Sequence, residues 1–280
     1  MYKLAIIGYP LSHSLSNVMH QAAFKACGLE GCYDVLETKP EDLVSVVKRL
    51  KSQGYNGFNV TIPHKVPITL FLEQFDDFSN LAGAVNTVKI LDDKTLYGYN
   101  TDVYGFINAL PKDINLSGEK VAIIGTGGAS RAVCTGLSSL GVSKIDLFTR
   151  NVANSHETVS GFRSKFKNVE VNLYQTEMLK TLEEYKVVVN TTPLGMKSFA
   201  SGISPLKDEI VKTLPDDGVM YDIVYNPIKT EFIKQAIKFN KKYVTGIDML
   251  ALQGARAFEI WTGVEVDVNV MKVAVLENLL

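Results

Sequence analysis

The stretch Val121-Ala122-Ile123-Ile124-Gly125-Thr126-Gly127-Gly128-Ala129-Ser130-Arg131 decides the fold of this chain. Its four leading apolar residues predict a buried strand, and a helix-like stretch from Ala129 to Leu140 follows the glycines. Strand, glycine turn and helix in this order build a dinucleotide-binding site, because glycines let the backbone approach a pyrophosphate at the helix start. The same residues also fit a tight loop without a ligand, and Ser130 stands where a third glycine or alanine is usual.

The composition is that of an ordinary globular protein of about two domains. The 280 residues include 46% hydrophobic and 21% charged side chains, with a net charge of −1. This balance favours neither a nucleic-acid partner nor a membrane surface, and no apolar run resembles a signal peptide or a transmembrane helix. Three scattered cysteines and four scattered histidines predict reduced thiols in a cytoplasmic protein without a metal site.

Strand-like and helical patterns alternate along the chain, which predicts an α/β fold with mostly parallel sheets. The glycine turn begins only at residue 125, so a segment of domain size precedes it. The apolar pattern breaks near 110–118, and after Gly246 it continues as helices without a strand. We therefore expect a discontinuous substrate-binding domain, residues 1–110 with 247–280, and a Rossmann-type dinucleotide-binding domain, residues 111–246.

The expected elements follow from this alternation. In the first domain we expect strands at Leu4–Ile7, Tyr33–Glu37, Phe58–Ile62 and Ala84–Leu91, and helices at Ser16–Cys27, Glu41–Gln53 and Val66–Phe75. In the second domain we expect strands at Val121–Ile124, Lys144–Phe148, Val169–Leu173, Val187–Asn190 and Val219–Ile223. Two terminal helices are expected at Asp248–Thr262 and Val268–Leu279.

Three serines and a histidine lie between the first expected strand and the first expected helix, within Ser12–Ser16. Either Ser14 or Ser16 is a suitable N-cap for that helix. One serine suffices for a cap, however, and the others then have hydroxyls available for a polyhydroxylated ligand. The sequence leaves both interpretations open.

A second polar cluster follows the strand at Phe58–Ile62. Alternation places Asn59 and Thr61 on one face of this strand and its apolar residues on the other. Lys65 comes just beyond the strand, so this segment has the pattern of a site wall with a cation at its rim. A solvated edge face with a surface lysine has the same pattern.

The third cluster comprises Asn86-Thr87 and Asn100-Thr101-Asp102. An aspartate that opens a helix often only stabilises the positive end of that helix. Asp102 is equally suited to hold an ammonium group. A lysine and a carboxylate in contact can relay a proton to or from a hydroxyl, which is half of what a dehydrogenase needs.

These segments resemble the shikimate dehydrogenase family, in the family's order and essentially from end to end. The matching motifs are Gly8-x-Pro10-Leu11-x-His13-Ser14-x-Ser16, the run from Phe58 to Lys65, Gly83-Ala84-Val85-Asn86-Thr87, Gly98-x-Asn100-Thr101-Asp102-x-x-Gly105, the glycine turn, Asn190-Thr191-Thr192-Pro193-x-Gly195-Met196, Asp222-x-x-Tyr225-x-Pro227, and Gly246-x-x-Met249-Leu250-x-x-Gln253-Gly254.

The resemblance implies a two-domain enzyme with its substrate in a cleft between the domains. Such an enzyme reduces 3-dehydroshikimate to shikimate with NADPH, on the route through chorismate to the aromatic amino acids. By similarity, the catalytic pair is Lys65 and Asp102. The implied substrate contacts, which include this pair, are Ser14, Ser16, Asn59, Thr61, Lys65, Asn86, Asp102, Tyr225 and Gln253. The implied cofactor contacts are Gly125, Thr126, Gly127, Gly128, Ala129, Thr149, Arg150, Thr191, Met196, Ile223 and Gly246.

The residues after the second strand of the dinucleotide domain favour NADP over NAD. NAD-specific sites usually have an acid about 20 residues beyond the glycines, whereas this chain has Thr149-Arg150-Asn151. Arg150 is suited to a 2′-phosphate, although a solvated turn explains an arginine there as well. Members of the family often carry a further basic residue, so discrimination against NAD is expected to be weaker than usual.

Other interpretations remain open at this point. A relative that also accepts quinate, with NAD or NADP, fits most of the same motifs. A binding module that has lost its chemistry is disfavoured because Lys65 and Asp102 are both present. A methylenetetrahydrofolate dehydrogenase is disfavoured by the serine-rich loop and the Asn-Thr-Asp run, which do not suit a flat aromatic substrate. A small-molecule substrate is the expected partner, and a monomer or a homodimer is compatible with the sequence.

Overall fold

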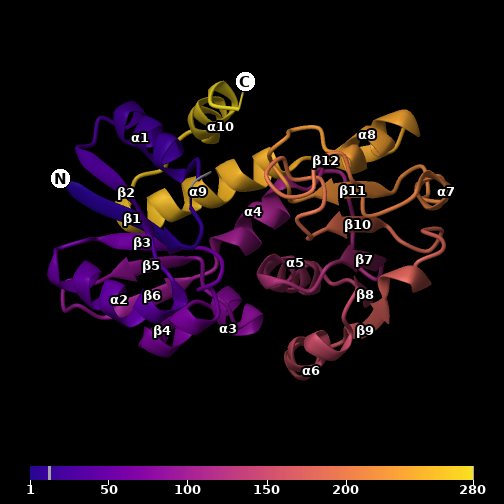
Figure 1. Cartoon of the computed structure of the whole chain (residues 1–280), viewed down its shortest axis with the longest axis horizontal. Coiled ribbons are helices and arrows are strands. Elements are labelled where there is room, and N and C mark those ends of the chain that lie inside the picture. Colours follow the sequence, from indigo (N-terminus) through magenta and orange to yellow (C-terminus); the bar gives the residue numbers. More distant parts are fainter. Residues whose placement is uncertain (12–13, 280) are drawn as a thin grey trace. The chain divides into compact units, whose positions relative to one another are not determined.

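The computed structural model describes residues 1–11 and 14–279 and divides the chain into two compact units. The first unit comprises Met1–Gly105 with Leu250–Leu280, and the second comprises Phe106–Met249. The chain passes between the units inside helices α4 (Thr101–Ala109) and α9 (Gly246–Thr262). Each unit has its own six-stranded sheet (Figure 1), which confirms the predicted two-domain α/β fold.

The first sheet has the strand order β2-β1-β3-β5-β6-β4. All its strands run in one direction except β5, which pairs antiparallel with both β3 and β6. The predicted mostly parallel sheet is thus confirmed, with β5 as the exception. The strands are β1 (Tyr2–Gly8), β2 (Gly31–Glu37), β3 (Gly57–Val60), β4 (Gln74–Phe75), β5 (Thr87–Ile90) and β6 (Leu96–Tyr99).

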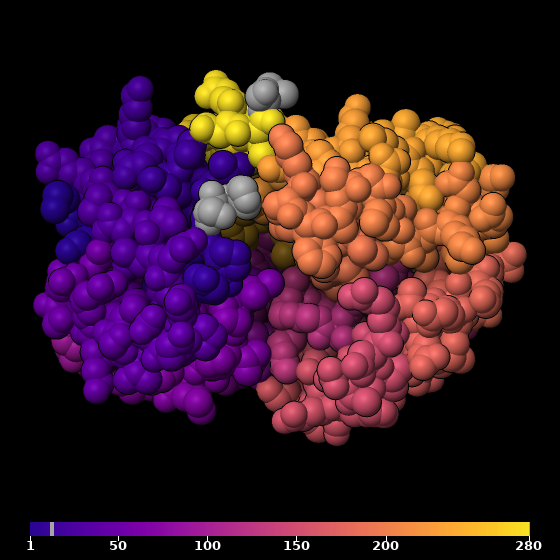
Figure 2. Space-filling view, viewed as in Figure 1, coloured from indigo at the N-terminus to yellow at the C-terminus, as the bar shows by residue number. Residues whose placement is uncertain are grey.

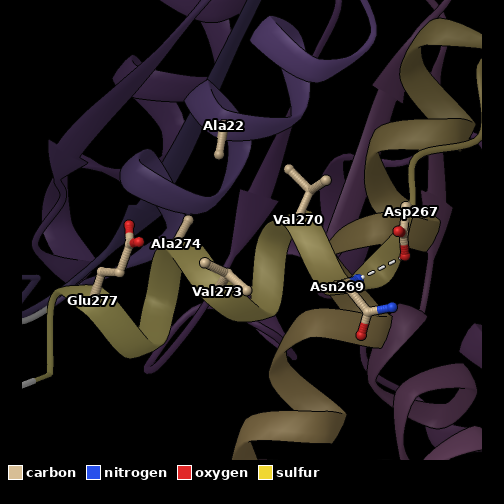
Figure 3. A pocket seen from close by; sticks show the side chains of 7 residues that line it. All are labelled: Ala22, Asp267, Asn269, Val270, Val273, Ala274 and Glu277. Carbon is tan, nitrogen blue, oxygen red and sulfur yellow. Dashed lines mark hydrogen bonds between the residues drawn. The ribbon is translucent and has the colours of Figure 1, made fainter.

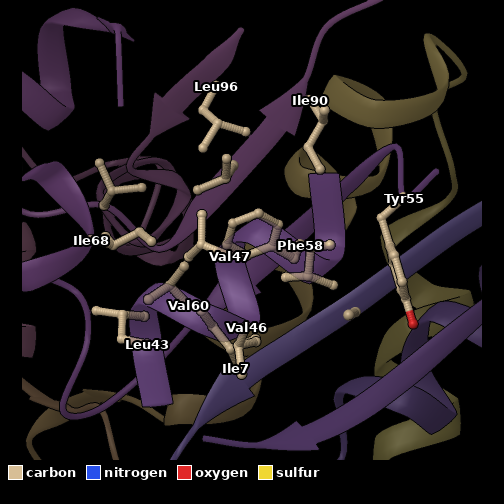
Figure 4. Packing of buried hydrophobic residues seen from close by; sticks show 14 residues of the cluster. Ile7, Leu43, Val46, Val47, Tyr55, Phe58, Val60, Ile68, Ile90 and Leu96 are labelled. Carbon is tan, nitrogen blue, oxygen red and sulfur yellow. The ribbon is translucent and has the colours of Figure 1, made fainter. Parts of the chain in front are cut away.

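Helices cover both faces of this first sheet. Figure 4 shows one face, where Val47 of α2 packs against Phe58 and Val60 of β3. Burying an apolar side chain of this size contributes about 1.5–3 kcal/mol to stability. On the other face, Phe24, Tyr33, Phe258 and Trp261 form an aromatic cluster around His20. The helices are α1 (Ser16–Ala26), α2 (Leu43–Ser52), α3 (Asp77–Ala82), α10 (Val268–Glu277) and parts of α4 and α9.

The helix predicted at Val66–Phe75 is wrong. The segment forms a 3-10 helix, Pro67–Phe71, and then the short strand β4 beside β6. Its apolar residues recur at helical spacing, yet a tight turn followed by an extended strand brings the same side chains into the core, namely Ile68, Phe71, Leu72 and Phe75.

The apolar face predicted for Phe58–Ile62 is also wrong at its last residue. Strand β3 ends at Val60, and Ile62 is 63% exposed. A turn follows the strand, in which the His64 amide donates to the Thr61 carbonyl over 2.9 Å. The alternation of faces therefore stops before Ile62.

The second sheet has the order β12-β11-β10-β7-β8-β9, and every neighbouring pair is parallel. This is the dinucleotide-binding order, and it reverses between β7 and β10, where such sheets bind ligands. The predicted Rossmann-type domain is confirmed. Its elements are β7 (Lys120–Ile124), α5 (Gly128–Ser139), β8 (Lys144–Thr149), α6 (His156–Lys165), β9 (Glu170–Gln175), β10 (Val187–Asn190), α7 (Asp208–Val211), β11 (Val219–Asp222), α8 (Glu231–Lys238) and β12 (Lys242–Val244).

Helix α10 packs on α1 in the first unit, so Val268–Glu277 lies beside Ser16–Ala26 (Figure 2). The contact leaves a groove lined by Ala22, Val270, Val273 and Ala274, with three polar residues, Asp267, Asn269 and Glu277, at its margins (Figure 3). Asp267 caps α10 by accepting a hydrogen bond from the Asn269 amide over 2.9 Å. This groove contains none of the predicted site residues. No helix within residues 1–11 and 14–279 is both long and apolar enough to cross a membrane.

We predict that Gly57→Ala destabilises the protein. A Cβ at this position would lie 2.2 Å from Trp261 Nε1 and 2.5 Å from the Val88 carbonyl oxygen. It would therefore disrupt the buried hydrogen bond of 2.9 Å between these two atoms. We expect a loss of about 1–3 kcal/mol, measured by thermal unfolding. Gly161→Ala, in an open helical position, is the control and should be neutral or slightly stabilising. Equal melting temperatures for both variants would contradict this packing.

Candidate active site

Lys65 and Asp102 form an ion pair in the first unit. The Lys65 ammonium donates to Asp102 Oδ2 over 2.6 Å, and the side chains are only 15% and 13% exposed. Asp102 lies in the first turn of α4, and Lys65 lies in the loop after β3. A pair this sheltered from water interacts more strongly than a surface salt bridge, which contributes about 0–1 kcal/mol.

The loop that carries Lys65 is held by its neighbours on both sides. The ring of His64 is buried, and its Nε2 lies 2.7 Å from the Thr38 carbonyl oxygen. Because a carbonyl only accepts, this nitrogen is the donor. The Lys65 carbonyl in turn accepts the Val85 amide over 2.8 Å. These bonds fix the backbone from which the lysine side chain extends.

Asn86 sets the position of the Asp102 carboxylate. The Asn86 Oδ1 accepts the Thr101 amide over 2.7 Å, and this bond determines which way the side-chain amide faces. The Nδ2 group then donates to Asp102 Oδ1 over 2.9 Å. One carboxylate oxygen is thus engaged by Asn86, and the other oxygen is left for Lys65.

Asn59 extends this network into the sheet. Its Nδ2 donates to the Asn86 carbonyl over 3.1 Å and to Thr87 Oγ1 over 3.0 Å. Its Oδ1 accepts the Tyr33 hydroxyl over 2.6 Å. Tyr33 was not predicted from sequence, because an aromatic residue on a buried strand has the pattern of core. Burial raises the pKa of the Tyr33 hydroxyl above its usual range, so this group stays a hydrogen-bond donor.

The other predicted substrate contacts of the first unit lie near these residues or beside the loop after β1. Gln253 Oε1 lies 3.4 Å from Asn86 Nδ2. Thr61 packs on Gly8, because a Cβ added at Gly8 would lie 2.4 Å from the Thr61 methyl group. Ser14 Oγ accepts the Ser16 amide over 3.4 Å, whereas the N-cap position of the helix that begins at Ser16 is Leu15, which makes no side-chain cap bond. The predicted motif residue His13 lies outside the described residues.

Tyr225 belongs to the second unit, in the loop after β11. Its side chain is half-buried, and burial raises the pKa of its hydroxyl. Its contact with the substrate stays a prediction.

The glycine turn after β7 has the space that a dinucleotide needs. Gly125 adopts a φ of 104°, and a Cβ there would lie 2.8 Å from Thr191 Oγ1, so only glycine fits without strain. At Gly127 and Gly128 a Cβ would meet no atom within 4 Å. The first amides of α5 follow these glycines, and helix-start amides have no intrahelical acceptor. Ser130 is accommodated because its hydroxyl donates to the Gly127 carbonyl over 2.6 Å.

The tip of β8 carries the predicted 2′-phosphate contact. Arg150 is exposed and forms no hydrogen bond or ion pair with the described part of the chain. The neighbouring hydroxyls are tied together, because Thr126 Oγ1 lies 3.3 Å from Thr149 Oγ1 and 2.6 Å from Ser155 Oγ. These bonds attach the glycine turn to the β8 tip, and residues 149–156 include no acid.

The remaining predicted cofactor contacts follow β10 and β11. Thr191 donates through its hydroxyl to the Ile124 carbonyl over 2.9 Å, which joins the loop after β10 to the end of β7. Gly246 lies so close to Ile223 that a Cβ would come within 2.4 Å of the Ile223 carbonyl oxygen. Met196 is half-buried beyond Thr191. Four predicted residues of the second unit thus lie at the carboxyl ends of neighbouring strands or beside them.

A glycine turn at the switch point of a parallel sheet, together with a sheltered lysine–carboxylate pair, defines the class as a dinucleotide-dependent oxidoreductase. Family models give the same assignment. The shikimate dehydrogenase substrate-binding domain matches residues 6–88, and the shikimate 5′-dehydrogenase C-terminal domain matches residues 246–276.

Individual relatives extend this similarity to the whole chain. An NADP(+) shikimate dehydrogenase of Methanocaldococcus jannaschii is 38% identical over 99% of this chain and 96% of its own length. The Thermus thermophilus shikimate 5-dehydrogenase, solved with NADP(H) and shikimate, superimposes with a TM-score of 0.86 at 33% identity over the full length of both chains. A quinate dehydrogenase of Corynebacterium glutamicum, solved with NAD, gives a TM-score of 0.90 at 28% identity over 99% of both chains. The chain belongs to the shikimate dehydrogenase family.

The buried ring of His20 makes the stability of the first unit sensitive to acid. His20 stacks on Tyr33 at 4.4 Å, and burial lowers its pKa from 6.5 to about 3, although the Asn59 side chain opposes this shift. Neither ring nitrogen of His20 has a hydrogen bond within the described residues. The oxygen and the nitrogen of the Asn59 side-chain amide bond instead to Tyr33, Asn86 and Thr87.

We therefore expect the contribution of His20 to the free energy of unfolding to fall as the pH drops below about 6.5. His20 then binds a proton in the unfolded chain but stays neutral in the folded chain. This difference changes the free energy of unfolding by up to about 1.4 kcal/mol per pH unit. In His20→Phe, the free energy of unfolding measured with urea should depend less steeply on pH between 4.5 and 6.5 than it does in the parent protein. An equally steep profile in the variant would assign the acid sensitivity to other groups.

Proposed function

We propose that this chain interconverts 3-dehydroshikimate and shikimate with NADP(H), in aromatic amino-acid biosynthesis. The observation that carries the proposal is the Lys65–Asp102 pair, held at 2.6 Å by the Asn86 network in a member of this family. The NADP(+) dependence of the relatives and the open glycine turn support the choice of cofactor. We also propose a cytoplasmic location, which the three unpaired cysteines favour.

Lys65 acts on the oxygen where the reaction changes charge. NADPH, when bound, supplies the hydride that reduces the ketone carbon. As negative charge develops on the carbonyl oxygen, the Lys65 ammonium stabilises that oxygen and donates its proton. In the oxidative direction, neutral Lys65 removes the proton from the same hydroxyl. Asp102 orients the lysine and balances its charge throughout.

Polar residues of the first unit suit the three hydroxyls and the carboxylate of shikimate. We propose direct contacts from Ser14, Ser16, Asn59, Thr61, Asn86 and Gln253, and a further contact from Tyr225 of the second unit. A site built to bond hydroxyls rejects analogues that lack them, because its own buried groups are then left unpaired.

The residues proposed to hold NADP belong to the second unit. The amides that follow Gly125 and Gly127 would bind the pyrophosphate, and Thr126, Gly128 and Ala129 complete the turn. Arg150 and Thr149 would hold the 2′-phosphate, and the residues that would hold the nicotinamide end are Thr191, Met196, Ile223 and Gly246. A single arginine at the β8 tip supports NADP with modest discrimination against NAD.

A quinate-accepting activity is the second candidate. The structural similarity to the quinate dehydrogenase, with a TM-score of 0.90, favours it. Quinate carries a further hydroxyl on a saturated ring, so it needs space and a partner near the carboxylate end. We expect kcat/KM for shikimate with NADP to exceed that for quinate with either cofactor. Comparable values for the two acids would assign the broader activity.

Lys65→Ala tests the proposed chemistry. Loss of a positioned acid–base group costs about 10²- to 10⁴-fold in rate, so kcat for shikimate oxidation should fall by that factor while KM changes only a few-fold. Lys51→Ala, which removes a lysine whose surface ion pair with Glu73 spans 3.8 Å, is the control and should retain the parent kcat. A large rise in KM with unchanged kcat would make Lys65 a binding residue only.

Arg150→Ala tests the choice of cofactor. Removing one charge-assisted bond to a 2′-phosphate should raise KM for NADP by about 10-fold or more. KM for NAD, which lacks that phosphate, should stay within about two-fold of the parent value. Steady-state kinetics with both cofactors make this comparison, and NAD serves as the internal control. Equal losses with both cofactors would show that Arg150 does not read the 2′-phosphate.

A further inference from the structure

Asp222 is a buried carboxylate without a cationic partner. It ends β11 and is 0% exposed, and no lysine or arginine of the described residues forms an ion pair with it. Three donors converge on it instead. Oδ1 accepts Asn190 Nδ2 and the Val224 amide, each over 3.0 Å, and Oδ2 accepts the Thr230 hydroxyl over 2.5 Å.

These donors belong to three different segments of the second unit. Asn190 ends β10 and also binds Thr192, whose amide donates to Asn190 Oδ1 over 3.0 Å. Val224 lies in the loop after β11. Thr230 caps α8 by accepting the Ile233 amide over 3.3 Å. One carboxylate therefore joins the loop after β10, the loop after β11 and the start of α8.

The charge is costly for the fold. Burial raises the pKa of Asp222 to about 6, against the three hydrogen bonds that lower it. The carboxylate is thus ionised at neutral pH in surroundings that favour its neutral form. A neutral side chain of the same size removes this desolvation cost, which offsets a hydrogen bond that it loses. Such local costs are expected at functional sites.

We propose that Asp222 is a positioning residue, which holds the loops of Thr191–Met196 and Ile223–Tyr225 in the arrangement that receives the nicotinamide end of NADP. The inference rests on the proposed function, because these loops carry four of its proposed contacts. Only a carboxylate accepts hydrogen bonds at both oxygens from all three donors. In Asp222→Asn, one of the two acceptor oxygens becomes an N–H group. Either the Asn190 and Val224 donors then lose their acceptor, or the Thr230 hydroxyl must turn from donor to acceptor, so the bonds that join the three segments change.

The test compares Asp222→Asn with a matched control, Asp146→Asn. Asp146 is also buried in the second sheet, 4% exposed, and accepts bonds from Tyr185 and Asn172 rather than from these loops. NADP affinity is measured by isothermal titration calorimetry, shikimate oxidation by steady-state kinetics, and stability by thermal unfolding at pH 7.5.

For Asp222→Asn we expect about a 10-fold weaker Kd for NADP and about a 10-fold lower kcat. Its melting temperature should nevertheless be equal to that of the parent or higher. A merely structural residue would lower stability instead. Asp146→Asn should keep both functional values within about two-fold. Parent-like binding and kcat in Asp222→Asn, or equal losses in both variants, would overturn the inference.

Thr230 provides an independent variant that leaves the aspartate in place. Thr230→Val removes the hydroxyl and should weaken NADP binding in the same direction, while Thr230→Ser should restore most of the affinity. Parent-like binding in Thr230→Val would also overturn the inference. The Kd for NADP does not depend on shikimate, so an inactive parent protein would refute the proposed function while Asp222 is still tested.

Discussion

The ion pair between Lys65 and Asp102 is the interaction on which the proposed chemistry of the first unit depends. Two charges sheltered from water at 2.6 Å need partners for their remaining lone pairs and protons, or the cost of desolvation exceeds the attraction. Asn86 supplies that partner for the carboxylate, and its own orientation is set by a backbone amide at Thr101. The pair is thus positioned by backbone groups, which side-chain motion disturbs little.

In the second unit, the arrangement of the proposed site depends on glycines rather than on a pair of charges. The close approach of Gly125 to Thr191 brings the ends of β7 and β10 together at the switch point of the sheet. Beyond it, Gly127 and Gly128 leave space in front of a helix start. One unit therefore concentrates polar side chains around the Lys65–Asp102 pair, and the other has no side chains at the two glycines where we propose that a phosphate approaches the backbone.

The sequence predicted those features that a short segment encodes by itself. The strand, glycine turn and helix of residues 121–140 are local. So is the alternation along the strand that puts Asn59 and Phe58 on opposite faces of the sheet. Pairing direction is not local, because the same alternation fits a parallel or an antiparallel strand; the reversal of β5 was missed for that reason. Strand β12 was missed because it has three residues, two of them exposed.

The missed part of the site has the same cause. Tyr33 lies opposite Leu4 of β1, and Asn59 lies opposite Ile6, so the two side chains meet only through the register of three strands. Asp222 was visible as a motif residue, but its convergence with Asn190 and Thr230 depends on loop geometry. Residue types and spacing thus suggested which groups we propose to do chemistry, whereas the groups that position them became visible only in the folded chain.

The most direct test of the account is the absorbance at 340 nm when the purified protein is mixed with shikimate and NADP. The account predicts a rise that is clearly faster than with quinate in place of shikimate. It also predicts that the rise is slower when NAD replaces NADP. A folded protein that binds NADP but gives no rise with shikimate would contradict the account, whatever its fold.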